Sequence, residues 1–114
     1  MTSLTRRAFT GDPPRVIENL ANERNLTIEA ALATGSRYID LNQASTKYCN
    51  AIGPDASHVY NLAAKDVTHV DGWGGIVFGR LVSDLLVEKY ADVRAVTRRN
   101  DTLSAELRQG LPAR

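Results

Sequence analysis

The sequence predicts an α/β fold with about three helices and two short parallel strands. The first observation is the order of elements over residues 20–41, where a helical pattern, a glycine turn and the short apolar segment Tyr38–Leu41 follow one another. This order is half of a β-α-β unit, in which the strands are parallel. The second observation is a regular apolar pattern of helical period over residues 72–90, as in a helix that covers a sheet.

Composition excludes several classes of protein. At 114 residues, the chain is long enough for one domain. Its 14 basic and 13 acidic side chains give a net charge of +1, so we expect no nucleic-acid partner. No apolar run approaches the roughly 18 residues of a membrane span, and the first residues lack the apolar region of a signal peptide. The single cysteine, Cys49, has no partner at metal-binding spacing, and we expect no metal and no cofactor.

The first third of the chain is predicted to contain a strand, a loop and a helix. Leu4–Arg6 reads as the end of a strand, and the following Gly11-Asp12-Pro13-Pro14 is a strong breaker of regular structure. Residues 20–34 form a loose helical pattern that ends at Gly35, where a glycine is expected after a helix. The apolar residues that share one face of this helix are Leu20, Ala21, Ile28, Ala31 and Leu32.

The middle of the chain is predicted to contain the second strand and a second helix. Tyr38–Leu41 is the strand, and Asn42 is a suitable N-cap for a helix over residues 43–52. Gly53-Pro54 stops that helix, and a polar connection over residues 55–65 follows.

The clearest helical pattern runs from about residue 72 to residue 90. Asp71 is the natural N-cap, and the inward positions are Phe78, Leu81, Val82, Leu85 and Leu86. Three of the first four residues are glycines, which cost up to about 1 kcal/mol each against alanine. A close backbone approach at the helix start would offset that cost. Residues 91–114, with five arginines and three acids, are expected to form a weakly structured basic tail.

One short polar loop carries the best candidate for a catalytic site. Asp66 and His69 lie three residues apart, immediately before the long helix. A carboxylate that accepts the Nδ1–H of an imidazole fixes its tautomer and stabilises the imidazolium, so that Nε2 can act as a general base. The alternative is a non-catalytic interaction module in which Asp66 and His69 only cap the loop.

Other charged residues could form a ligand-binding site, but structural roles explain their positions more simply. Arg6 and Arg7 could bind an anionic group, although a solvated surface pair is the simpler interpretation. Asp40 lies at the exit of the predicted strand, where ligand crevices lie in α/β sheets, but an Asp at such a position is more often a loop or cap residue. His58 has no carboxylate at comparable spacing and is expected to be exposed.

The segment Asp66-Val67-Thr68-His69-Val70-Asp71, with Gly74 and the helix after it, resembles the last block of the SGNH (GDSL-type) hydrolases. Within them it is most similar to the rhamnogalacturonan acetylesterase-like carbohydrate esterases. Three further stretches agree in order, namely residues 3–7, residues 36–42 and Ala51-Ile52-Gly53-Pro54. The likeness covers residues 1–90 and implies the C-terminal portion of a three-layer α/β/α, flavodoxin-like domain. It also implies secretion and an acetylated polysaccharide, such as pectin, as substrate.

The resemblance assigns Asp66 and His69 to two positions of a Ser-His-Asp triad. His69 would deprotonate a serine and later protonate the departing alcohol, while Asp66 orients it. The chain departs from the family because the Gly-Asp-Ser block of the nucleophile and the Gly and Asn blocks of the oxyanion hole are missing. Gly11-Asp12 is followed by Pro13, and neither Ser45 nor Ser57 has the glycine neighbours of a nucleophile elbow. We therefore expect the chain to be inactive alone.

Overall fold

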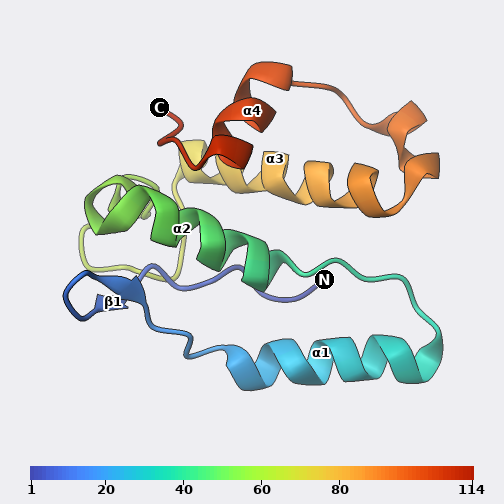
Figure 1. Cartoon of the computed structure of the whole chain (residues 1–114), viewed down its shortest axis with the longest axis horizontal. Coiled ribbons are helices and arrows are strands. Elements are labelled where there is room, and N and C mark those ends of the chain that lie inside the picture. Colours follow the sequence, from blue (N-terminus) through green and yellow to red (C-terminus); the bar gives the residue numbers. More distant parts are fainter.

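The computed structural model describes residues 1–114 and is mainly helical (Figure 1). The helices are α1 (Ala21–Thr34), α2 (Leu41–His58), α3 (Gly72–Lys89), the 3₁₀ helix η1 (Ala91–Val96) and α4 (Asp101–Gln109). The only sheet pairs β1 (Phe9–Thr10) with β2 (Arg15–Val16) in antiparallel fashion. The predicted α/β fold with two short parallel strands, as part of a three-layer α/β/α domain, is therefore wrong. No helix combines the length and the apolar character needed to cross a membrane.

The two predicted parallel strands are extended segments that do not form a ladder. No backbone hydrogen bond joins Leu4–Arg6 to Tyr38–Leu41, and the one nearby bond runs from Thr2 N, before the first segment, to Ile39 O at 3.1 Å. Farther along, the amide of Thr5 donates to the side chain of Ser45, and the amide of Arg7 donates to Val67 O at 2.8 Å. A parallel pair needs evenly repeated backbone bonds between the same two strands. These backbone groups are satisfied by different partners instead, so no sheet forms.

The helices predicted over residues 20–34, 43–52 and 72–90 are all present, but the second is longer than predicted. Gly35 ends α1 with a φ of 66°, a left-handed conformation that glycine adopts at little cost. Asp71 caps α3 by accepting a hydrogen bond from Gly74 N at 2.7 Å, as expected. The break at Gly53 in α2 is also present, with a φ of 81°, but a further helical stretch follows it and ends at His58.

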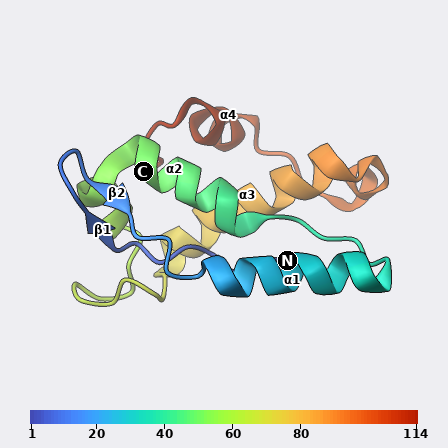
Figure 2. The ribbon, with the colours of Figure 1, turned by 60° about the horizontal axis from the view of Figure 1, so that its bottom comes forward.

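The core lies where α2, α3 and α4 meet (Figure 2). Its buried side chains come from these three helices and from the segments beside them: Val16, Tyr48, Cys49, Tyr60, Val77, Phe78, Leu103, Leu107 and Ala113. The aromatic rings of Tyr48, Tyr60 and Phe78 pack against one another, with edge-to-face contacts onto Phe78. Burial of such rings dominates the stability of a small core.

The C-terminal segment is part of this core, which differs from the weakly structured tail expected over residues 91–114. Leu103 and Leu107 of α4 are buried, and Asn100 caps the helix by accepting from Leu103 N at 3.1 Å. Beyond α4, Ala113 O accepts hydrogen bonds from Tyr60 Oη at 2.7 Å and from Trp73 Nε1 at 3.2 Å. The sequence indicates this short helix only weakly, because only two leucines, four residues apart, mark its inner face.

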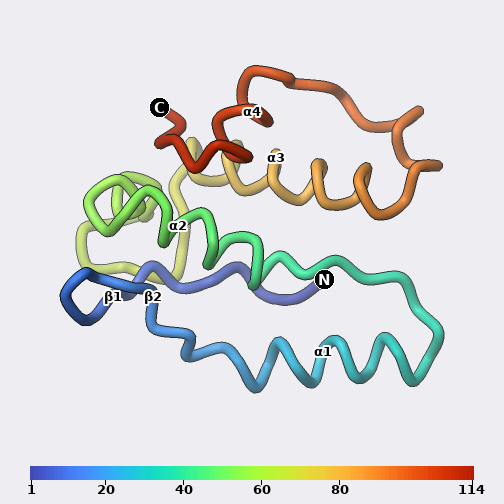
Figure 3. The backbone as a smooth tube through the Cα atoms, in the orientation of Figure 1, coloured from blue at the N-terminus to red at the C-terminus, as the bar shows by residue number.

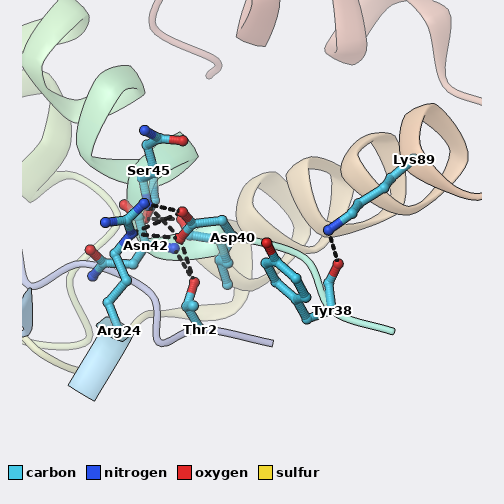
Figure 4. Close-up of polar contacts among 9 residues, drawn as sticks. Thr2, Arg24, Tyr38, Asp40, Asn42, Ser45 and Lys89 are labelled. Atoms are coloured by element: carbon cyan, nitrogen blue, oxygen red, sulfur yellow. Dashed lines mark hydrogen bonds and ion pairs between the residues drawn. The ribbon is translucent and has the colours of Figure 1, made fainter. Parts of the chain in front are cut away.

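Helix α1 lies at the periphery and is attached by an ion pair (Figures 3 and 4). The Nε of Arg24 donates to Asp40 Oδ2 at 2.8 Å, and Asp40 Oδ1 accepts from the hydroxyl of Thr2 at 2.8 Å. Asp40 also caps α2 through Gln43 N, so its role is structural. Partial burial raises the pKa of Asp40, but the hydrogen bonds from Arg24 and Thr2 outweigh burial and hold it below its usual range.

Candidate functional site

A closed loop between α2 and α3 carries the candidate residues. Asn61 and Val70 form an isolated antiparallel bridge at the base of this loop. Two backbone bonds flank the bridge, from Leu62 N to His69 O at 3.2 Å and from Asp71 N to Tyr60 O at 3.0 Å. The chain therefore leaves α2, folds back on itself and enters α3 beside the point where it left.

The start of α3 packs tightly against this base. A Cβ atom added to Gly74 would lie 2.7 Å from Tyr60 O and 3.0 Å from Val70 Cβ. The same atom on Gly72 or Gly75 would meet nothing within 4 Å. The close approach expected from the three glycines is thus present at one of them. It fixes the loop against a rigid helix, as a precise site requires.

Asp66 and His69 form the expected hydrogen-bonded pair. Asp66 Oδ2 lies 2.8 Å from His69 Nδ1, and an ionised carboxylate can only accept, so Nδ1 carries the proton. The other oxygen, Oδ1, accepts from the backbone amides of Thr68 and His69, each at 2.9 Å. The backbone bond from His69, its side-chain bond and the amide of Thr68 lower the pKa of Asp66 to about 2. The carboxylate is therefore fully ionised at neutral pH.

The second ring nitrogen of His69 makes no hydrogen bond within the chain. The side chain of His69 is 71% exposed, whereas that of Asp66 is 28% exposed. With Nδ1 protonated and held by Asp66, a neutral imidazole presents Nε2 as an unpaired acceptor. This is the arrangement that a general base needs toward a hydroxyl group.

Arg7 holds the loop in place through hydrogen bonds, a role that the sequence did not predict. The residue is completely buried rather than part of a solvated surface pair. Its Nη2 donates to His69 O at 2.7 Å, and its Nε donates to the side-chain oxygen of Asn61. The backbone carbonyl of Arg7 lies 2.8 Å from His58 Nε2. His58 is therefore hydrogen-bonded, although the residue is exposed, as expected.

The buried guanidinium of Arg7 is satisfied almost entirely by neutral groups. No carboxylate pairs with it, and it lies 5.9 Å from the centre of the Phe78 ring. Burial lowers the pKa of Arg7, but a guanidinium stays charged at any ordinary pH. The sequence contains only a weak signal that Arg7 is buried. Thr5 and Arg7 are two residues apart, so their side chains lie on the same side of an extended segment, and both are buried.

No hydroxyl of this chain is in position to act with His69. Ser45 is buried and donates to Leu41 O at 2.6 Å, and Ser57 is buried beside Cys49 O. Burial raises the pKa of the Cys49 thiol to about 11, so it is no thiolate nucleophile. No group of three or more His, Cys, Asp or Glu side chains is arranged to hold a metal ion.

Comparisons of the chain with protein families, with characterised proteins and with solved structures found no match. The resemblance to the SGNH hydrolases accordingly rests on the sequence blocks alone. The geometry of the Asp66–His69 pair is independent of that resemblance.

Proposed function

We propose that this chain is the C-terminal portion of an SGNH-type carboxylic ester hydrolase acting on acetylated, pectic carbohydrate. In this proposal, Asp66 and His69 are two members of a Ser-His-Asp triad. One observation carries it: the 2.8 Å contact between Asp66 Oδ2 and His69 Nδ1, with Nε2 exposed and unpaired. The sequence blocks over residues 1–90 supply the substrate class.

The proposed mechanism gives both residues of the pair a role. His69 Nε2 takes the proton of a serine hydroxyl as that oxygen attacks the ester carbonyl, and later returns a proton to the departing sugar oxygen. Asp66 keeps Nδ1 protonated and stabilises the imidazolium that forms between the two steps. Since no hydroxyl of this chain reaches His69, the serine must come from a preceding block of the same enzyme.

The first experiment measures hydrolysis of p-nitrophenyl acetate by the purified chain. We expect a rate no higher than that of free imidazole at the same concentration, without an acyl-enzyme burst. Removing the nucleophile of a triad costs about as much as removing the whole triad. Turnover well above imidazole that His69→Ala abolishes would show that the chain holds its own nucleophile, and the proposal would fail.

The second experiment reads and uses the coding sequence before Met1. We expect an open frame that encodes a Gly-Asp-Ser block and joins this chain. In the joined protein, His69→Ala should lower kcat by several orders of magnitude. The control is His58→Ala, which removes the other histidine and its bond to Arg7 O and should lower kcat far less than His69→Ala does. Intergenic sequence before Met1, or equal loss in both variants, would contradict the proposal.

The alternative function is a non-catalytic interaction module in which the Asp66 carboxylate serves only as a cap. The bonds from Thr68 N and His69 N to Asp66 Oδ1 favour it, because they form a local turn without any need for catalysis. The variant Asp66→Asn distinguishes a catalytic role from a cap, because the amide oxygen of Asn can still accept the backbone hydrogen bonds of the loop but carries no charge. A cap alone tolerates this change, whereas a triad loses most of its activity, as expected for a misoriented tautomer.

A further inference from the structure

A cleft far from the loop of Asp66 and His69 has a strong excess of positive charge. Its lining residues come from α2, α3 and the segment that runs through η1 to α4, and its volume is about 910 Å³. Its lining includes neither Asp66 nor His69. The net charge of +1 for the whole chain conceals this local excess.

Six cations and three carboxylates line the cleft. The cations come from five different parts of the fold, namely α2, α3, η1, the linker after η1, and α4: Lys47, Arg80, Arg94, Arg98, Arg99 and Arg108. Two of them are already paired, Arg80 with Asp84 at 2.9 Å and Arg99 with Asp101 at 3.0 Å. Of the carboxylates, only Glu88 has no partner.

Four cations therefore remain without a hydrogen bond or an ion pair. Lys47 belongs to α2, Arg94 to η1, Arg98 to the linker after η1, and Arg108 to α4. All four residues are exposed, so their side chains are free to reach a ligand. Like charges gathered in one concave region repel each other and focus a positive potential there.

We propose that this cleft binds a small anion that carries two or more oxyanion groups. The guanidinium fork matches the two oxygens of a carboxylate or phosphoryl group, and bonds between such charged partners are the strong ones. A single charged group would engage only part of the set. A compact ligand with several groups can contact cations from α2, η1 and α4 together.

The lining favours a small ligand over a nucleic-acid strand. Binding to single strands uses aromatic rings on which bases stack, and the only aromatic residue of this cleft, Tyr48, is buried in the core. The unpaired carboxylate of Glu88 and the amide of Gln109 also suit the hydroxyl groups of a small polar molecule.

The test is calorimetric titration of the whole chain at low ionic strength with pyrophosphate, citrate and acetate. We expect saturable binding of pyrophosphate, of citrate or of both, none of acetate, and weakening as salt is added. The double variant Arg98→Gln with Arg108→Gln should lose about tenfold in affinity. The matched control is Arg15→Gln, an exposed and unpaired arginine outside this cleft, which should bind as the parent does.

The titrations with pyrophosphate and with citrate distinguish a phosphorylated ligand from a polycarboxylate. Binding of pyrophosphate alone supports a phosphorylated ligand, and binding of citrate alone supports a polycarboxylate. Equal binding of both, lost in the double variant, supports recognition by charge and shape. Absence of binding, or equal loss in the Arg15→Gln control, would overturn the proposal. Nucleic-acid binding that exceeds pyrophosphate binding would also overturn it. None of these outcomes depends on esterase activity.

Discussion

The Asp66 carboxylate makes the order of its loop dependent on pH. Its pKa of about 2 is well below the ordinary value of about 3.9, because two amides and the imidazole of His69 bond to the charged form. A carboxyl group whose pKa is lower in the folded state than in the unfolded state stabilises the folded state at any pH above its unfolded-state pKa. This stability is lost as the pH falls through the folded-state pKa. We predict that the loop keeps its order at pH 4 and loses it toward pH 2.

Backbone amide spectra of Thr68 and His69 measure this transition directly. Both amide signals should move together with a midpoint near pH 2, since both donate to Asp66 Oδ1. Asp66→Asn is the control: its oxygen can still accept, but the signals should not titrate there. A midpoint near 4 in the parent chain would mean that the carboxylate is not held as described.

Replacing Arg7 tests whether a buried cation holds the loop. Arg7→Met keeps much of the side-chain volume but leaves His69 O and the Asn61 side chain without their donor. We expect a loss of about 3 kcal/mol in the free energy of unfolding, measured by urea denaturation, because charged bonds to buried acceptors are lost. Arg6→Met, at the half-exposed neighbouring position, should change it by less than about 0.5 kcal/mol. Equal effects would show that Arg7 has no special role.

The sequence predicts the contact between Asp66 and His69 but misses the contacts of Arg7, for a physical reason. Asp66 and His69 lie three residues apart in one turn, so their contact follows from local spacing. Arg7 reaches Asn61 and His69 across 54 and 62 residues of chain. No local pattern encodes such a contact, and a basic residue beside another basic residue predicts a surface.

At the scale of elements, the start of α3 offers a matched pair of glycines. Gly75→Ala meets no atom within 4 Å and should stabilise the chain by up to about 1 kcal/mol, because alanine favours a helix. Gly74→Ala places its methyl group 2.7 Å from Tyr60 O and should destabilise the chain by about 1–3 kcal/mol. Thermal unfolding of both variants checks the prediction. The same sign of change in both would contradict the packing described at this helix start.

The helices α1, α2 and α3 followed from the sequence, whereas η1, α4 and the strands did not. Helical period, the Asp71 cap and the Gly35 stop are local signals, and each acts within a few residues of the element it bounds. A strand needs a partner segment whose backbone groups are free. Tyr38–Leu41 instead enters α2 at Leu41, and the Tyr90 hydroxyl binds both the Tyr38 amide and the Tyr38 carbonyl.

For the whole molecule, the core joins α2, α3 and α4 and leaves α1 outside. Only 22 of the 114 residues are buried, so each large side chain shared by these three helices matters to stability. Helix α1 buries Ala31 alone, while its Leu26 and Leu32 are 64% and 69% exposed. Sequence period placed the apolar residues of α1 on an inner face, but α1 packs weakly because there is no sheet for that face to cover.

We predict that α1 opens independently of the rest of the molecule. Its amides should exchange with solvent faster than those of α2 and α3, since little apolar surface holds it in place. The ion pair between Arg24 and Asp40, whose side chains are 30% and 18% exposed, attaches α1 to the start of α2, and we expect it to contribute about 1 kcal/mol. Arg24→Gln should therefore speed exchange in α1 by about fivefold and leave α3 unchanged.

Hydrogen exchange followed by mass spectrometry, with peptides from α1, α2 and α3, measures this difference. Arg99→Gln is the control, because it removes the highly exposed pair with Asp101 and touches no residue of α1. Its α1 peptides should exchange as those of the parent do. If Arg24→Gln speeds exchange equally in α1 and α3, the molecule opens as one unit, and α1 belongs to the same cooperative core.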